Sequence, residues 1–307
     1  MKLGIAGQLT HLDEPNPVLL PPDWRAVDAP AAQRVRQAGF RGAQLFFDRP
    51  LEAGRDDLLR VKRAFADADL EVAQVNGWYE PLCSYDDGVR AAGIGGMQAL
   101  VRIGRLMDAP SVYVRPGGHN PSGHWYAHPE NHSPRTFDRL VDSLRKVCAV
   151  AQAEGVPLAI EGHVLSALDT PQRVRDLLDA VGSPMLKFNY DPVNFVGTVR
   201  QVHDTSSVLN ELYALLGRDI VAAHAKDCRL ADQLVVHIEE VVPGSGAMNY
   251  ALFMRQFQQA CPNGYFIIEH LPNALVPQAR VYVASAARAF GIPLSSDRDA
   301  RPVSRGG

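Results

Sequence analysis

Along the chain, short apolar runs alternate with longer segments in which apolar positions recur every three or four residues. A short apolar run bounded by turn residues is typical of a buried strand, and the longer period is typical of an amphipathic helix. Strands are expected at Lys2–Gly7, Gly42–Asp48, Glu71–Asn76, Ser111–Arg115, Pro157–Val164, Leu186–Asn194, Ile220–Asp227 and Tyr265–Leu271. Helices are expected at Trp24–Ala38, Asp56–Ala68, Gly88–Met107, Pro134–Glu154, Pro171–Val181, Thr205–Leu216, Met248–Ala260 and Val276–Phe290.

The alternation of strand and helix predicts a parallel sheet with right-handed crossovers. Eight such units are present, and no Gly-rich dinucleotide fingerprint follows the first strand. We therefore expect an α/β fold of the closed (β/α)8 TIM barrel type rather than an open doubly wound sheet. Residues 1–293 would form this single domain, and residues 294–307 a polar C-terminal tail.

Several helix ends have local support. Ser133 and Thr170 each precede a proline, so each can cap a helix that carries proline in its first turn. Gly39 and Gly155 follow expected helices and suit a left-handed C-terminal cap.

Four of the expected strands end in polar residues that are unusual in a buried core. These residues are Glu161, Asp191, His224 and Glu269. The active sites of this barrel type lie where the carboxyl ends of the strands meet, so the four side chains should converge. Burying three carboxylates together is costly unless a cation neutralises them, and hard divalent ions take oxygen ligands with an occasional imidazole. The pattern predicts a metal site that leaves coordination room for a substrate.

The strings EGH, NYDPVN, HAKD, PGSG and IIEH, at these strand ends and in the loop before the seventh helix, resemble the xylose-isomerase-like TIM barrel superfamily. Its members include ketose 3-epimerases, hydroxypyruvate isomerase, inosose dehydratase, dehydroshikimate dehydratase and the endonuclease IV branch. The resemblance implies that one divalent metal is bound by Glu161, Asp191, His224 and Glu269. Mn²⁺ is the expected ion because one imidazole with three carboxylates suits an intermediate ion, while Mg²⁺, Co²⁺ and Zn²⁺ are also compatible.

The resemblance also implies a chemistry. The metal would hold adjacent carbonyl and hydroxyl oxygens of a sugar or related polyol and stabilise an enediolate. Glu161 and Glu269 would then act as acid and base, one removing a proton and the other returning one. An isomerase or epimerase is the leading hypothesis.

Six further residues near the strand ends are candidate substrate ligands: His163, Lys226, Arg229, Asn194, Arg115 and Asn76. His163 could equally be a packed histidine, and Lys226 could form a salt bridge to Asp227 or Glu269. Arg229 could simply be solvated. Asn194 stands where the epimerase pattern commonly has a histidine, so a simple ketose specificity is in doubt.

Two long connections should rise from the same face of the barrel as the strand ends. They cover Gln8–Pro22 and residues 116–133, and the second contains His119, His124, His128 and His132. These histidines match no standard metal-site spacing. We interpret the second loop as a structured element that contacts the substrate or a neighbouring subunit.

Composition narrows the classes further. The 307 residues are 46% hydrophobic and 21% charged, with a net charge of -3 and no basic block, so no nucleic-acid partner is expected. Four separated cysteines without a CxxC pair favour a reducing cytoplasm. The first ten residues do not read as a signal peptide, and no apolar stretch is long enough to span a membrane.

Three alternatives stay open. A metal-dependent lyase or dehydratase acting on a keto-sugar, a keto-inositol or an oxidised glycoside would share the deprotonation step and then expel a leaving group. A non-catalytic partner subunit and an abasic-site endonuclease are the others. A small-molecule carbohydrate substrate and a homo-oligomeric state follow from the resemblance.

Overall fold

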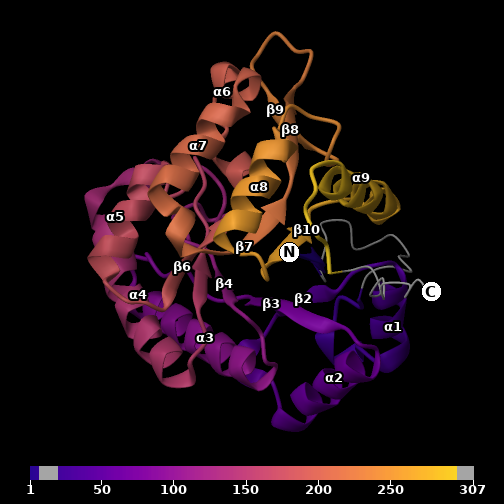
Figure 1. Ribbon diagram of the computed structural model, residues 1–307. Coiled ribbons are helices and arrows are strands. Elements are labelled where there is room, and N and C mark those ends of the chain that lie inside the picture. Colours follow the sequence, from indigo (N-terminus) through magenta and orange to yellow (C-terminus); the bar gives the residue numbers. More distant parts are fainter. Residues whose placement is uncertain (7–19, 296–307) are drawn as a thin grey trace, which may run out of the picture.

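The computed structural model describes residues 1–6 and 20–295. Eight parallel strands close into a barrel in the order β1-β10-β7-β6-β5-β4-β3-β2, and helices surround it (Figure 1). The barrel strands are β1 (Lys2–Ala6), β2 (Gly42–Phe47), β3 (Glu71–Gly77), β4 (Val112–Val114), β5 (Leu158–Ile160), β6 (Leu186–Tyr190), β7 (Ile220–Ala225) and β10 (Tyr265–Ile268). This confirms the expected (β/α)8 barrel.

Within the described residues, eight helices follow the strands as the periodicity predicts, and a short ninth helix, Val199–His203, was not expected. They are α1 (Ala29–Gln37), α2 (Arg55–Asp67), α3 (Asp87–Leu106), α4 (Pro134–Glu154), α5 (Pro171–Val181), α6 (Val199–His203), α7 (Thr205–Leu216), α8 (Tyr250–Ala260) and α9 (Val276–Ala289). Ser133 and Thr170 cap α4 and α5, and Gly155 ends α4 in the left-handed conformation, as predicted. Among these described helices, none is both long and apolar enough to cross a membrane.

The first expected helix, Trp24–Ala38, is two elements. Trp24–Ala26 forms a 3-10 turn, and α1 begins only at Ala29. Asp28 lies between them in extended backbone, and its side chain accepts a hydrogen bond from Ala31 N at 2.8 Å. An aspartate in this position caps a new helix, so it interrupts a segment whose apolar spacing is continuous.

Two expected strands, Pro157–Val164 and Leu186–Asn194, end earlier than their sequences suggested. β5 stops at Ile160 and β6 at Tyr190, and the polar residues beyond them leave the ladder. After β6, Pro192 opens a 3-10 turn, because proline has no N–H to continue the ladder. The candidate metal ligands that follow these two strands, Glu161 and Asp191, therefore lie at the start of loops.

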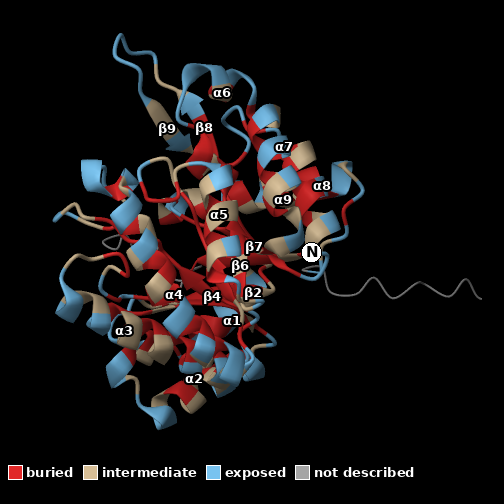
Figure 2. Ribbon diagram, turned by 90° about the vertical axis from the view of Figure 1, so that its left-hand side faces the viewer, coloured by how far each residue is buried: buried red, intermediate tan, exposed pale blue. Residues whose placement is uncertain are grey.

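A two-stranded antiparallel hairpin was not predicted. β8 (Asp227–Leu230) follows β7 almost directly and pairs with β9 (Ile238–Val241). The hairpin projects beyond the red, buried barrel strands in Figure 2. Three consecutive residues of its tip, Leu234, Val235 and Val236, are exposed. Both strands contain charged residues, so the hairpin could not be recognised from apolar runs in the sequence.

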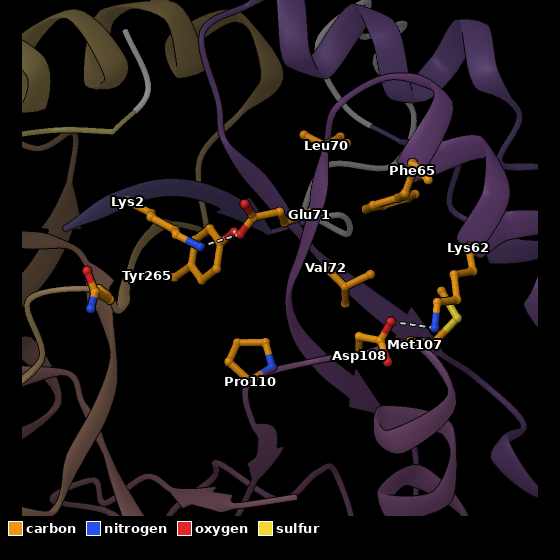
Figure 3. A pocket seen from close by; sticks show the side chains of 12 residues that line it. Lys2, Lys62, Phe65, Leu70, Glu71, Val72, Met107, Asp108, Pro110 and Tyr265 are labelled. Carbon is orange, nitrogen blue, oxygen red and sulfur yellow. Dashed lines mark hydrogen bonds and ion pairs between the residues drawn. The ribbon is translucent and has the colours of Figure 1, made fainter. Parts of the chain in front are cut away.

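The opposite end of the barrel, where strands begin, holds a cavity of about 350 Å³. Figure 3 shows its charged side chains engaged with one another. Lys2 pairs with Glu71 at 2.5 Å, Tyr265 donates to the same carboxylate, and Lys62 pairs with Asp108 at 2.5 Å. No charged group of this cavity is left without a partner among the residues described.

The single-domain boundary and the tail stay predictions, because residues 296–307 lie outside the described residues. Most of the first long connection, residues 7–19, also lies outside them.

Candidate metal centre

Four side chains predicted as metal ligands come together at the carboxyl end of the barrel. Their strands are consecutive around the barrel, in the order β5, β6, β7 and β10. Three of the residues, Glu161, Asp191 and Glu269, come directly after the last residue of a strand, and His224 lies within β7. All four are buried, with exposed fractions between 0% and 6%. We call this group the cage.

The ligand atoms of the cage face one another. His224 Nδ1 lies 2.9 Å from Glu161 Oε1 and 2.9 Å from Glu269 Oε1. It also lies 3.8 Å from Asp191 Oδ2. One such atom from each of the four residues lies within 4.8 Å of all the others. A single ion can therefore contact all four side chains.

The hydrogen bonding of the cage fits a metal ion. Both oxygens of Asp191 and both ring nitrogens of His224 are buried without a hydrogen bond, although Asp191 Oδ2 forms an ion pair with Lys226. Buried polar atoms normally find hydrogen-bond partners, so acidic and imidazole atoms that converge in this way fit a site for a cation. Three carboxylates and one imidazole suit a divalent ion of intermediate hardness. Within residues 1–6 and 20–295, no other group of acidic, histidine and cysteine side chains has this arrangement.

Neighbouring positive charges favour the ionised forms of Glu269 and Asp191. Burial raises the pKa of Glu269, but the imidazoles of His224 and His270 and the ammonium of Lys226 outweigh it and hold this pKa well below its ordinary value. Burial likewise acts against Asp191, whose pKa is lowered by Lys226 and His224. For His224, burial lowers the pKa, but the Glu269 and Glu161 carboxylates raise it well above its ordinary value.

Lys226 supplies the positive charge nearest to the cage. Its Nζ atom lies 2.7 Å from Asp191 Oδ2 and 2.8 Å from Glu269 Oε1. The side chain is 2% exposed, and the two carboxylates hold its pKa well above the ordinary value despite burial. Asn194 Oδ1 accepts from the same ammonium at 3.5 Å. The salt bridge to Glu269 is thus present together with one to Asp191 that was not foreseen.

The suggested salt bridge from Lys226 to Asp227 does not form. The Asp227 carboxylate instead accepts backbone N–H bonds from the loop that follows β9, at Gly244, Gly246 and Met248. It fixes this loop beside the mouth of the barrel.

Glu161 is held by two donors that the sequence did not single out. Tyr113 Oη donates to Glu161 Oε2 at 2.6 Å, and Asn189 Nδ2 donates to Glu161 Oε1 at 2.8 Å. Both partners are buried. The Glu161 carboxylate is therefore fixed in one orientation before any ion or substrate binds.

A line of amides leads to this carboxylate through the barrel interior. Asn76 donates to Gln44, Gln44 donates to Gln74, and Gln74 donates to Asn189, at 3.3, 2.8 and 3.2 Å. Each amide accepts from one neighbour and donates to the next, so the chain has one direction and ends on Glu161. The predicted substrate ligand Asn76 is the first member of this chain.

The other predicted substrate ligands lie in different surroundings. His163 accepts from Leu165 N at 3.1 Å and stacks near the Trp125 ring, and burial lowers its pKa to about 4. Arg115 is buried one residue beyond β4. Arg229, in contrast, is exposed on the hairpin, where it pairs with Glu239 at 2.6 Å. The structure thus brings Lys226 and Asn194 to the cage and leaves Arg229 outside it.

His270, next to Glu269, is partly exposed and contacts the hairpin. Its side chain is 44% exposed, and Nδ1 lies 3.3 Å from Glu240 Oε2 on the hairpin. The backbone of His270 has a φ of 57°, in the left-handed region.

The histidines of residues 116–133 do not join the cage. His119 Nε2 contacts Thr136 Oγ1 at 2.8 Å, and His132 pairs with Asp169 at 3.2 Å. His124 is buried against the rings of Trp78 and Tyr79. This arrangement agrees with a structured loop rather than with a second metal cluster.

Comparison with known proteins adds the family. The chain matches the model described as xylose isomerase-like TIM barrel over residues 32–288. A protein of this description from Mycobacterium smegmatis, in complex with magnesium, superposes with a TM-score of 0.71 at 15% identity, covering 94% of this chain and 97% of that one. D-psicose 3-epimerase from Clostridium cellulolyticum H10, with D-tagatose, gives 0.68 at 15% identity over 95% and 99%.

The 3-keto-D-glucoside 4-epimerase of E. coli is also similar, with a TM-score of 0.66 at 16% identity over 93% of this chain and 99% of that one. The sequence has no significant match among curated proteins. At these identities the structural likeness shows the fold alone.

Proposed function

Because the chain belongs to the xylose isomerase-like TIM barrel family, we propose that it is a divalent-metal-dependent isomerase or epimerase of a sugar or related polyol. The observation that carries the proposal is the buried cage, whose two glutamates stand at the ends of β5 and β10. A divalent ion, which we propose to be Mn²⁺, would supply Lewis acidity to adjacent carbonyl and hydroxyl oxygens of the substrate.

The two glutamates are held differently, and this suggests distinct roles. Every contact of Glu269 within the described residues goes to Oε1, which faces Lys226 and His224. Its Oε2 is left without a donor, so it can accept the proton next to the substrate carbonyl. Glu161 has donors on both oxygens and is the more firmly positioned group. It takes up a proton from solvent and delivers it from the other side of the substrate.

Solvent-deuterium exchange tests this proposal. The Mn²⁺-loaded protein is incubated with a panel of ketoses and keto-acid sugars in D₂O, and exchange next to the carbonyl is followed by NMR after the metal is removed. We expect exchange with at least one sugar, and a loss of about 10²- to 10⁴-fold in Glu269→Gln. Glu240→Gln removes a partly exposed glutamate of the hairpin as the matched control. Absence of exchange with every sugar would contradict the proposal.

A lyase is the second candidate, and Lys226 is the observation that favours it. A protonated ammonium beside Asp191 and Glu269 can donate to a departing oxygen on the carbon next to the carbanion. Release of water or an aglycone from a keto-substrate, measured by mass spectrometry, would distinguish this reaction from epimerisation.

A further inference from the structure

Arg115 is a buried cation without an anion. It is 7% exposed and is the only buried arginine among the residues that the structure describes. Its Nη2 atom donates to the carbonyl oxygen of Gly77 at 2.6 Å, whereas its buried Nε atom has no partner. No described carboxylate pairs with it. An unpaired buried charge is expensive, so a partner is expected from outside the chain.

The position of Arg115 places it beside the cage. β4 and β5 are neighbours in register, with Val114 opposite Ile160, so Arg115 and Glu161 follow side by side at the mouth. Glu161 N donates to the carbonyl oxygen of Val114 at 3.0 Å. Tyr113 points inward to Glu161, and Arg115, two residues further, extends to the same side of the strand.

The surroundings of the guanidinium form a subsite. Its Cζ atom lies 4.7 Å from the centre of the Tyr79 ring and 5.5 Å from that of Trp78. His124, itself 8% exposed, stacks on the same two rings, and its Nδ1 atom also has no partner. Burial, and then Arg115, lower the pKa of His124 to about 4, so His124 is neutral at pH 7. Two neighbouring buried side chains thus each have one nitrogen without a partner, Arg115 Nε and His124 Nδ1.

Charge balance defines the ligand. The three cage carboxylates are neutralised by a divalent ion together with the Lys226 ammonium. The charge of Arg115 is left over, and its planar fork matches a carboxylate. We infer that Arg115 binds a carboxylate of the substrate, so that the cage acts on a keto-acid sugar rather than on a neutral ketose. This inference rests on the proposed function for the reaction, but binding can be tested separately.

Binding is measured with compounds that have no carbonyl and cannot react. D-gluconate and D-glucitol differ at C1, where a carboxylate replaces an alcohol, and calorimetry on the Mn²⁺-loaded protein gives both dissociation constants. We expect D-gluconate to bind at least about 30-fold more tightly than D-glucitol, the size typical of a buried charged hydrogen bond. Arg115→Gln should raise the dissociation constant of D-gluconate by a similar factor and leave that of D-glucitol unchanged.

Arg135→Gln is the matched control. Arg135 also lies over an aromatic ring, with its Cζ atom 4.0 Å from the centre of the Tyr85 ring, but it is exposed. Its loss should change neither dissociation constant. If Arg115→Gln leaves D-gluconate binding intact, the carboxylate is held elsewhere and the inference is wrong. Tighter binding of D-glucitol 6-phosphate than of D-gluconate would also overturn it, because a guanidinium binds phosphate as well and the subsite would then belong to a phosphate.

Measurements of turnover can distinguish a failure of this inference from a failure of the proposed function. D-fructuronate should exchange deuterium with a lower KM than D-fructose, and Arg115→Gln should raise only the KM for D-fructuronate. Equal KM values for the two sugars would refute the carboxylate assignment while leaving the epimerase proposal intact. If no sugar exchanges but D-gluconate still needs Arg115, the proposed reaction fails and the anion subsite stands.

A structural role for Arg115 makes a different prediction. Removing a buried, unpaired charge should leave the melting temperature of the ligand-free protein unchanged within about 3 °C, or raise it. A larger fall in Arg115→Gln would show that the guanidinium supports the fold, and would overturn its assignment as a substrate ligand.

Discussion

Replacing Lys226 with methionine should destabilise the metal-free protein far more than the metal-loaded one. The ammonium lies 2.7 Å from Asp191 and 2.8 Å from Glu269, and its side chain is 2% exposed. Removing one partner of a buried ion pair typically costs about 3–5 kcal/mol, because the remaining charges stay buried without compensation. At about 2 °C per kcal/mol for a chain of this size, the melting temperature should fall by about 6–10 °C in the presence of a chelator.

A divalent ion places positive charge among the same carboxylates. At 1,000 times its dissociation constant it stabilises the folded state by about 4 kcal/mol, and it replaces the charge lost with the lysine. The gap between wild type and Lys226→Met should then shrink to less than about 2 kcal/mol. The variant should also bind Mn²⁺ more tightly, since the ammonium no longer repels the ion.

Thermal unfolding in EDTA and in excess MnCl₂ measures the difference in stability between wild type and Lys226→Met without and with metal. Lys187→Met is the matched control, because Lys187 pairs with Asp219 at 3.0 Å but is 29% exposed. Its loss should cost less than about 1 kcal/mol, with or without metal. An equal melting temperature of Lys226→Met and wild type in EDTA would refute the reasoning. A stability difference between the two proteins that is the same in EDTA and in MnCl₂ would also refute the reasoning.

Three other predictions concern the cage and the assembly. Since the pKa of His224 is raised well above 6.5 in the metal-free protein, this histidine should be protonated at pH 7. Mn²⁺ binding should therefore release close to one proton, and the affinity for Mn²⁺ should rise with pH up to the raised pKa. Calorimetry in buffers of different ionisation enthalpy measures the number of protons released. No release would show that the imidazole is already neutral. Asn189→Ala should weaken Mn²⁺ binding about 10- to 100-fold by freeing Glu161, whereas Asn210→Ala, on α7, should not. A homo-oligomer should sediment at a multiple of 33.5 kDa, and a monomer mass at micromolar concentration would contradict that expectation.

The convergence of Glu161, Asp191, His224 and Glu269 could be predicted from the order of strands and helices along the chain. The period of the apolar runs defines the strand ends, and the closed barrel brings the ends of consecutive strands together. Placing Glu161 and Asp191 at this end of the barrel required only that they follow β5 and β6, not that the strand boundaries be exact. The placement was therefore right although both strands are shorter than the sequence suggested.

The supporting groups could not be predicted in the same way. Tyr113 and Asn189 lie inside strands, where a tyrosine or an asparagine is compatible with several surroundings, and only the register shows that both reach Glu161. A signal was present, since Gln44 and Gln74 are polar residues in otherwise apolar runs. Such residues indicate an inward-facing polar network once a closed barrel is assumed. The hairpin was missed because its charged strands carry no apolar run.

The distribution of buried groups without hydrogen-bond partners indicates where the candidate site lies, independently of any resemblance to a known family. Arg90 and Arg175 each lack a partner only at Nε, and other nitrogens of both are held by carboxylates. On the strand-end face, Arg115, His124, Asp191 and His224 each have a buried atom that makes no hydrogen bond, although Asp191 forms an ion pair with Lys226. At the strand-start end, by contrast, the charged groups satisfy one another. Unpaired buried groups at one end only are expected where ligands complete the interactions, and the ion and the anionic sugar that we propose would do so here.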